Sequence, residues 1–497
     1  MKIKTIYLTI AITISSLMIF ACSEKQPEQQ RPNVLFIAVD DLRTELNCYG
    51  EKHMHTPNID RLAAQGTLFE KAYCQQAVCA PSRNSLMTGL RPDAMGIYDL
   101  QTFFRTKVPD VITLPQHFIN NGYHSEGMGK IYHTGHGNSD DSRSWSVPKW
   151  SIREKISQLK KITSGDTVGL ERDFPMIDGL KIPWYRSPQP EGHMSDAMVA
   201  ELAVERINAL KDSTFFLAVG FVKPHLPFVA PKKYWDLYDP NQIGIPERKV
   251  PDGMPEQALN NFGELRKYYG IPAEGPLDDE TSRNLVHGYY AAVSMIDAQV
   301  GKLLDALEEN GLMDKTIIVL WGDHGWKLRD YGSWCKHTNM EMDVNAPLIF
   351  YAPGMQQGQT TRSLAEFVDI YPTLCDLAGL DKPVHLEGQS LLPVIKDPLA
   401  EVNKVAISQY PRGQSLGYDR KSELMGYSIR TDRYRLTRWQ KYEAPEEVIA
   451  MELYDHSASK TAGVNLATLK QYEETVEELN RLMNEELSKY RLLKAKR

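Results

Sequence analysis

Cysteine is scarce in this sequence, with six among 497 residues. Their spacing shows neither the paired pattern of a zinc site nor a recognisable disulfide framework. An excess of basic residues is also absent. The formal net charge is −7, and it becomes −9 without residues 1–21, which hold two lysines and no acidic residue. This charge excludes a typical nucleic-acid-binding protein.

The chain opens with an apolar run, Ile6–Phe20, that is too short for a confident membrane span. Two lysines precede the run, as in a secretory signal. Ala21 before Cys22 resembles a bacterial lipoprotein cleavage box, which predicts a signal peptide at 1–21 and lipidation of Cys22; simple cleavage is the alternative. Residues 22–31 then form a polar tether. We therefore expect an exported protein, in the periplasm and held at the outer membrane by a lipid anchor only.

The remainder is divided by its pattern into a catalytic domain at 32–412 and a small subdomain at 413–497. Apolar strands alternate with helical segments in the first part, which predicts a large, mainly parallel sheet flanked by helices. The second part predicts a short antiparallel sheet and one helix. The expected helices are Asn58–Gly66, Ser195–Leu210, Tyr289–Asn310 and Ala467–Tyr490, and the expected C-terminal strands are Tyr427–Thr431 and Arg433–Trp439.

Two apolar strands are each followed by a pair of polar residues, Asp40-Asp41 and Asp323-His324. Asn33–Val39 and Thr316–Leu320 both read as strands buried on two faces. Ligands bind at the carboxyl ends of strands in open α/β sheets, and Ca²⁺ prefers oxygen ligands, so the pairs predict a cation site. A helix cap or turn is the simpler interpretation of the first pair. The predicted ligands are Asp40, Asp41, Asp323 and His324.

The segment Cys-Ala-Pro-Ser-Arg at 79–83 predicts a fixed turn before a helix. Pro81 restricts the backbone, and Ser82 could cap a helix beginning near Arg83. Cys79 would then lie at a positive helix N-terminus beside a permanent cation, where an anion would bind. From these residues alone, a buried cysteine acting as a small apolar side chain is the more common case.

Several basic side chains follow other predicted strands. Lys130 and His133 are spaced to face one point on a helical turn. His225 follows the apolar strand Phe215–Val222, and Lys336 lies beyond the Asp323-His324 pair. Without further context, a solvated surface turn and an unremarkable loop histidine are the simpler interpretations.

Together these motifs resemble the formylglycine-dependent sulfatase family. Cys79-x-Pro-Ser-Arg-x-x-x-x-Thr-Gly89 is similar to the sulfatase signature, and the other motifs occur in the order found in the iduronate-2-sulfatase branch. That branch resembles this chain in carrying Asp-His where other sulfatases often have asparagine. The resemblance covers residues 32 to about 440 and is weakest at 138–190. It implies the alkaline-phosphatase-like sulfatase fold.

The resemblance also implies a role for each candidate residue. Cys79 would be converted to formylglycine by a formylglycine-generating enzyme, and its hydrated aldehyde would be the nucleophile. One Ca²⁺ per chain would be held by residue 79 and the four ligands above. His133 would accept a proton, and His225 or Lys336 would protonate the leaving sugar oxygen. The remaining assignments are Arg83, Lys130 and Lys336 as cations that stabilise the transition state, and Trp326, His225 and Lys336 as contacts to substrate.

The expected activity is exo-acting removal of 2-O-sulfate from a non-reducing-end uronate, either iduronate or a 4,5-unsaturated uronate. The partner would be a heparin/heparan or chondroitin/dermatan oligosaccharide or disaccharide. Three alternatives stay open: another sulfated sugar or an aryl sulfate, a phosphodiesterase or phosphonate hydrolase of the same superfamily, and a non-catalytic sugar-binding lipoprotein.

Overall fold

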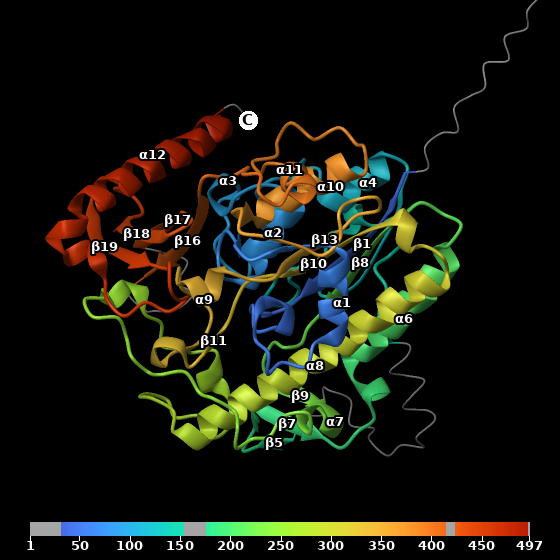
Figure 1. Cartoon of the computed structure of the whole chain (residues 1–497), viewed down its shortest axis with the longest axis horizontal. Helices are drawn as coiled ribbons and strands as arrows, with labels where there is room; N and C mark the ends of the chain where they lie inside the picture. Colours follow the sequence, from blue (N-terminus) through green and yellow to red (C-terminus); the bar gives the residue numbers. More distant parts are fainter. Residues whose placement is uncertain (1–30, 154–174, 414–422, 496–497) are drawn as a thin grey trace, which may run out of the picture. The chain divides into compact units, whose positions relative to one another are not determined.

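The longest apolar segments form neighbouring strands in the middle of a seven-stranded sheet, shown by the computed structural model of the chain (Figure 1). β1 (Asn33–Val39) pairs in parallel with both β10 (Thr316–Gly322) and β8 (Phe215–Phe221), and all three strands are buried throughout. The strand order is β14 (Gln359–Thr361), β2 (Thr67–Phe69), β13 (Leu348–Tyr351), β10, β1, β8 and β4 (His124–Gly129). β13 runs antiparallel to both neighbours, so the sheet is mixed and mainly parallel, as predicted.

Alternate side chains of β1 enter two separate apolar cores, because successive strand residues point to opposite faces. The odd-numbered side chains face the core under α1 (Pro57–Gln65), α6 (Ser195–Leu210) and α8 (Asp279–Glu309). The even-numbered side chains face the core under α2 (Cys79–Thr88), α4 (Leu114–Asn120) and α10 (Ile370–Leu377). Helices therefore cover both faces of the sheet. A ligand site can form at the carboxyl ends of its strands, which these helices do not cover.

A second sheet of four antiparallel strands follows the main sheet. It consists of β16 (Ala406–Arg412), β17 (Leu424–Arg430), β18 (Tyr434–Lys441) and β19 (Val448–Asp455). One side of α12 (Glu473–Ala495) packs on this sheet through Leu479, Met483 and Leu487. The predicted antiparallel sheet and helix are both present, although the sheet already begins at Ala406, before residue 413. Residues 32–497 form one unit by their internal contacts.

The remaining elements are short. The helices are α3 (Pro92–Met95), α7 (Lys232–Trp235), α9 (Glu341–Val344) and α11 (Leu392–Lys396). The two-stranded pairings are β3 (Ala72–Tyr73) with β15 (Ala365–Glu366), β5 (Met176–Ile177) with β6 (Leu180–Lys181), β7 (Trp184–Ser187) with β9 (Phe228–Pro231), and β11 (Lys327–Leu328) with β12 (Trp334–Cys335).

The structure describes residues 31–153, 175–413 and 423–495. The predicted signal peptide, the lipidation of Cys22 and nearly all of the tether lie outside these residues. Within them, no helix combines the length and apolar character needed to cross a membrane. The five cysteines in the described ranges, all but Cys22, are free thiols.

Candidate active site

Four neighbouring parallel strands deliver polar side chains to one edge of the main sheet. Asp40 and Asp41 follow β1, and Asp323 and His324 follow β10. Lys130 follows β4, and the segment that carries the candidate histidine at 225 follows β8. Parallel strands end at the same edge, so the predicted groups are brought together by topology.

The turn after β1 is fixed by the long helix α8. Asp41 has a left-handed backbone (φ 57°), which is uncommon for a residue with a side chain. The hydroxyl of Tyr289 donates to the Asp41 carbonyl at 2.8 Å and accepts from the Arg43 amide at 2.9 Å. The Asp41 amide in turn donates to Asp323 Oδ1 at 3.0 Å. These bonds hold the two acidic segments in register.

Cys79 is the first residue of α2, and its side chain lies at the helix N-terminus as predicted. The cap residue is Val78, in an extended conformation. The expectation that Ser82 caps a helix from Arg83 is wrong: the Ser82 hydroxyl donates to the Asp323 carbonyl and so joins α2 to the end of β10. Cys79 is 3% exposed, and burial raises the pKa of its thiol well above the ordinary value.

Arg83 connects the two acidic segments. Its Nε donates to Asp323 Oδ2 at 2.9 Å, and Nη2 donates to Asp40 Oδ1 at 3.1 Å. Nη1 donates to the carbonyls of Lys130 and Ile131. The Arg83 side chain is fully buried, so its charge is compensated entirely by these acceptors.

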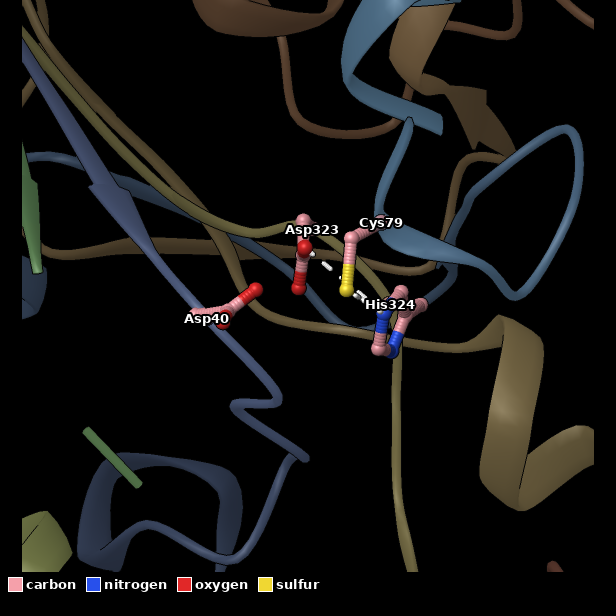
Figure 2. Close-up of side chains that lie close together, drawn as sticks. All are labelled: Asp40, Cys79, Asp323 and His324. Carbon is pink, nitrogen blue, oxygen red and sulfur yellow. Dashed lines mark hydrogen bonds and ion pairs between the residues drawn. The ribbon is translucent and has the colours of Figure 1, made fainter. Parts of the chain in front are cut away.

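One ligand atom each from Asp40, Cys79, Asp323 and His324 lies within 4.8 Å of the others (Figure 2). Figure 2 shows these side chains converging from β1, the start of α2 and the end of β10. His324 Nδ1 is 3.0 Å from the Gly325 carbonyl, which orients the ring so that Nε2 lies 3.4 Å from Cys79 Sγ and 3.4 Å from Asp41 Oδ1. Carboxylate oxygens together with an imidazole nitrogen form a donor set that can hold a divalent cation.

The carboxylates are balanced by three cations. Asp40 accepts from Lys130 and Arg83, which hold its pKa well below the ordinary value although burial alone would raise it. Lys336 Nζ donates to Asp41 at 2.9 and 3.1 Å. Burial opposes the charge of Lys336, but Asp41 raises its pKa well above the ordinary value. Each of the two lysines is therefore paired with a carboxylate of the candidate metal site.

His133 lies near this cluster but not on a helix. The segment after β4 is irregular, so the expected helical turn that joins Lys130 and His133 is absent. Burial and then Lys130 lower the pKa of His133 to about 3, which leaves a neutral imidazole that can accept a proton. Its Nε2 is 3.2 Å from Nδ1 of His136, an exposed histidine that the sequence analysis did not select.

Lys336 and His225 both lie near Asp41 and share a carboxylate that the sequence analysis missed. Glu264 is 3.1 Å from Lys336 Nζ and 3.2 Å from His225 Nε2. His225 Nε2 is also 3.9 Å from Asp41. Trp326 is 1% exposed and packs against Lys336, with Nζ 4.8 Å from the ring centroid, so its ring contacts Lys336 and is shielded from solvent.

Sequence comparison identifies relatives along most of the chain. The Sulfatase family profile matches residues 32–380, and the profile "N-sulphoglucosamine sulphohydrolase, C-terminal" matches residues 325–489. Iduronate 2-sulfatase from Homo sapiens is 36% identical over an alignment that covers 89% of this chain and 91% of the human protein. A sulfatase from Formosa agariphila is 31% identical, covering 92% of this chain and 87% of that protein.

Solved structures share the fold. A phosphonate monoester hydrolase from Silicibacter pomeroyi superposes with a TM-score of 0.74 at 22% identity, covering 93% of this chain and 96% of that one. A structure described as a 2-O GAG sulfatase superposes with a TM-score of 0.68 at 21% identity, covering 93% of both. The alkaline-phosphatase-like fold that the sequence predicted is thereby confirmed. With the family profile and the relatives above, these findings confirm the predicted resemblance: the chain belongs to the sulfatase family.

Proposed function

We propose that this sulfatase is an exo-acting enzyme that removes the 2-O-sulfate from a uronate at the non-reducing end of a glycosaminoglycan fragment. The similarity to iduronate 2-sulfatase over about nine-tenths of both chains supports this substrate class. A 4,5-unsaturated uronate, the end group that bacterial lyases leave, is a candidate beside iduronate. Heparin/heparan and chondroitin/dermatan fragments both contain such ends.

The nucleophile we propose is a formylglycine made from Cys79 by a separate maturation enzyme. The structure contains the unmodified cysteine, whose Sγ stands in for an oxygen of the hydrated aldehyde. That oxygen would lie at the N-terminus of α2, within reach of the Asp40, Asp323 and His324 ligand atoms. Lys130 and Lys336 also act on residue 79 electrostatically, and their positive charge suits the approach of a sulfate ester.

The metal we propose is one Ca²⁺, held by Asp40, Asp41, Asp323, His324 and residue 79. When bound, it supplies positive charge that favours ionisation of the attacking hydroxyl and offsets charge on sulfate. The three carboxylates already balance Arg83, Lys130 and Lys336, so a divalent ion would make this cluster net positive. A net positive cluster matches an anionic substrate.

The chain's residues then divide the proton transfers. One hydroxyl of residue 79, having lost its proton to water, attacks sulfur, and the sulfur–oxygen bond to the sugar breaks while Lys130 and Lys336 face the sulfate. The buried Arg83 adds positive charge from behind Asp40 and Asp323. His225 or Lys336 gives a proton to the departing sugar oxygen. His133 takes the proton of the second hydroxyl, the carbonyl re-forms, and sulfate leaves as its bond to residue 79 breaks. Water then hydrates the aldehyde for the next turnover.

A phosphonate monoester hydrolase of the same fold is the second candidate, because two such enzymes superpose with TM-scores of 0.74 and 0.75. Their sequence identities of 22% and 21% establish only the fold. A ratio of kcat/KM for matched aryl sulfate and aryl phosphonate esters separates the two activities. We expect the sulfate ester to be preferred.

The substrate is tested with two disaccharides, one sulfated only at uronate O2 and one only at glucosamine O6. We expect sulfate release from the first to be faster by at least about tenfold, and none from a Cys79→Ala variant. Peptide mass spectrometry of the same preparation tests whether residue 79 has lost its sulfur. It also tests whether Cys22 carries a lipid, which is the membrane anchor that we propose for this exported protein. Faster release from the second disaccharide would overturn the uronate assignment and leave the sulfatase activity intact.

A further inference from the structure

Glu264 gathers three nitrogen donors that come from two distant segments of the chain. Its carboxylate lies 3.1 Å from Lys336 Nζ, 3.2 Å from His225 Nε2 and 3.4 Å from His337 Nε2. The Glu264 side chain is 20% exposed and belongs to the segment just before a 3₁₀ helix at Leu265–Lys267. Neither an acidic motif nor a strand end marks its position.

The donor and acceptor roles in the hydrogen bonds between Glu264 and the two histidines follow from the chemistry of these groups. A carboxylate only accepts, so Nε2 of His225 and Nε2 of His337 both carry hydrogens that point at Glu264. His225 Nδ1 lies 2.7 Å from the Leu226 carbonyl, and His337 Nδ1 lies 3.0 Å from the hydroxyl of Tyr410 in β16. Both rings are therefore held on two sides, with Glu264 at the centre.

The orientation of the Lys336 ammonium group depends mainly on Glu264. Its other carboxylate partner, Asp41, is a proposed metal ligand, and the ring of Trp326 below offers only a non-directional contact. Lysine is a flexible side chain with freely rotating donors. Glu264 is thus the one carboxylate near Lys336, among the described residues, that can direct its ammonium group without also belonging to the candidate metal site.

We propose that Glu264 is a positioning residue that holds Lys336 where its ammonium group protonates the departing sugar oxygen, and that fixes the ring of His225 beside it. The inference rests on the leaving-group role proposed for Lys336. A sugar alkoxide is strongly basic and needs a proton as its bond to sulfur breaks, whereas a nitrophenolate leaves without one. The contribution of Glu264 must therefore increase with the basicity of the leaving group.

The test is a Brønsted series of aryl sulfates of rising phenol pKa, extended by the 2-O-sulfated disaccharide. For Glu264→Gln we expect kcat to fall less than about threefold on 4-nitrophenyl sulfate and roughly 10²-fold on the sugar sulfate, in line with the loss of general-acid catalysis. The slope of log kcat against phenol pKa becomes steeper, and KM changes little. Glu264→Asp, which keeps the charge one methylene back, recovers part of the loss.

The matched control is Glu191→Gln. Glu191 also accepts from two lysines and a tyrosine, Lys233, Lys302 and Tyr234, but lies outside the strand-end cluster. We expect it to change neither the slope nor kcat. The inference is overturned if Glu264→Gln lowers kcat equally for all substrates of the series, or does not lower kcat for the sugar sulfate. If the glutamine variant does not fold, the same two outcomes are judged with Glu264→Asp.

Lys336→Met separates this inference from the proposed function. A steeper slope for Lys336→Met with an unchanged slope for Glu264→Gln would overturn the positioning role and leave the proposed mechanism in place. Unchanged slopes in both variants would overturn the two together. A wild-type enzyme that ignores the 2-O-sulfated disaccharide would refute only the proposed substrate, because the aryl series still measures the slope.

Discussion

At the scale of single residues, the three cations of the site are not equivalent. Arg83 has four acceptors, two of them backbone carbonyls, and its geometry is closed. Lys130 pairs with Asp40, and Lys336 pairs with Asp41 and Glu264. The two lysines can exchange a carboxylate for a substrate oxygen, while Arg83 cannot do so without breaking the contact between the two strand ends.

The proposed calcium should be measurable through stability as well as activity. Chelation of the active enzyme should abolish turnover and lower Tm, and added Ca²⁺ should restore both, because binding to the folded state stabilises it. Asp41→Asn removes one charged ligand and should raise the Ca²⁺ concentration needed for half of the Tm shift by at least about tenfold. Asp376→Asn, which alters a surface ion pair with Lys382, is the control. Full activity of verified metal-free enzyme would refute the proposal.

At the scale of elements, β19 carries a buried acid with an unusual titration. Burial raises the pKa of Glu452 to about 7, even though Trp439 Nε1 and the Tyr454 hydroxyl donate to its oxygens at 2.6 Å. The folded state therefore binds this proton more tightly than the unfolded chain, in which the pKa is near 4.5. The stabilisation is complete below about pH 4.5 and is lost as the pH rises through 7.

Glu452→Gln should remove this pH dependence. The variant should be more stable than the wild type at pH 8, by an amount on the order of 1–3 kcal/mol, and the difference should vanish or reverse at pH 5. Urea unfolding at both pH values measures it. Glu447→Gln, at an exposed pair with Lys441, should show no such difference. An advantage that is equal at pH 5 and pH 8 would contradict the assigned titration.

Element positions were predictable where burial dictates composition. β1 and α6 have the predicted bounds. A strand buried on both faces is continuously apolar, and the polar pair Ser195-Asp196 marks the first turn of α6. α8 begins ten residues earlier than predicted: Asp278 caps it by accepting from the Thr281 amide, and its first turns are polar. The prediction that Ser82 caps a helix was wrong, because the Ser82 hydroxyl donates instead to the carbonyl of Asp323, 241 residues away in the sequence.

The sequence predicted that polar residues from two strand ends and Cys79 lie together, and the structure brings Asp40, Cys79, Asp323 and His324 together. Pairs of polar residues after apolar strands and a long signature can be found in a sequence, but Glu264 belongs to neither kind of pattern. Glu264 lies in an irregular segment, 39 residues after His225 and 72 before Lys336, and has no periodic neighbours. Its contacts depend on loop paths that local sequence does not determine.

At the scale of the whole molecule, buried ion pairs join the C-terminal antiparallel sheet to the part of the chain that contains the main sheet. Glu341 in α9 accepts from Arg430 of β17 and from Arg435 of β18, and also from the Tyr73 hydroxyl. β16 adds the contact from Tyr410 to His337 beside the site. The C-terminal sheet is therefore part of the structure that supports the active site.

This connection predicts one cooperative unfolding transition for residues 32–497. Calorimetry should show a single endotherm, and Glu341→Gln should lower its midpoint by several degrees, since breaking a buried ion pair costs about 3–5 kcal/mol. Glu256→Gln, at an exposed site, should leave it unchanged. Two separate endotherms in the wild type would show that the sheets unfold independently.

The burial of Cys79 limits the time during which the proposed oxidation can occur. The residue is 3% exposed once folded, and His324, which contacts its sulfur, is synthesised 245 residues later. At typical translation rates the nascent chain presents an accessible cysteine for about 10–50 s before that contact can form. A maturation enzyme of the kind we propose would therefore work on the growing or unfolded chain, and the fraction of active enzyme would depend on the relative rates of oxidation and folding.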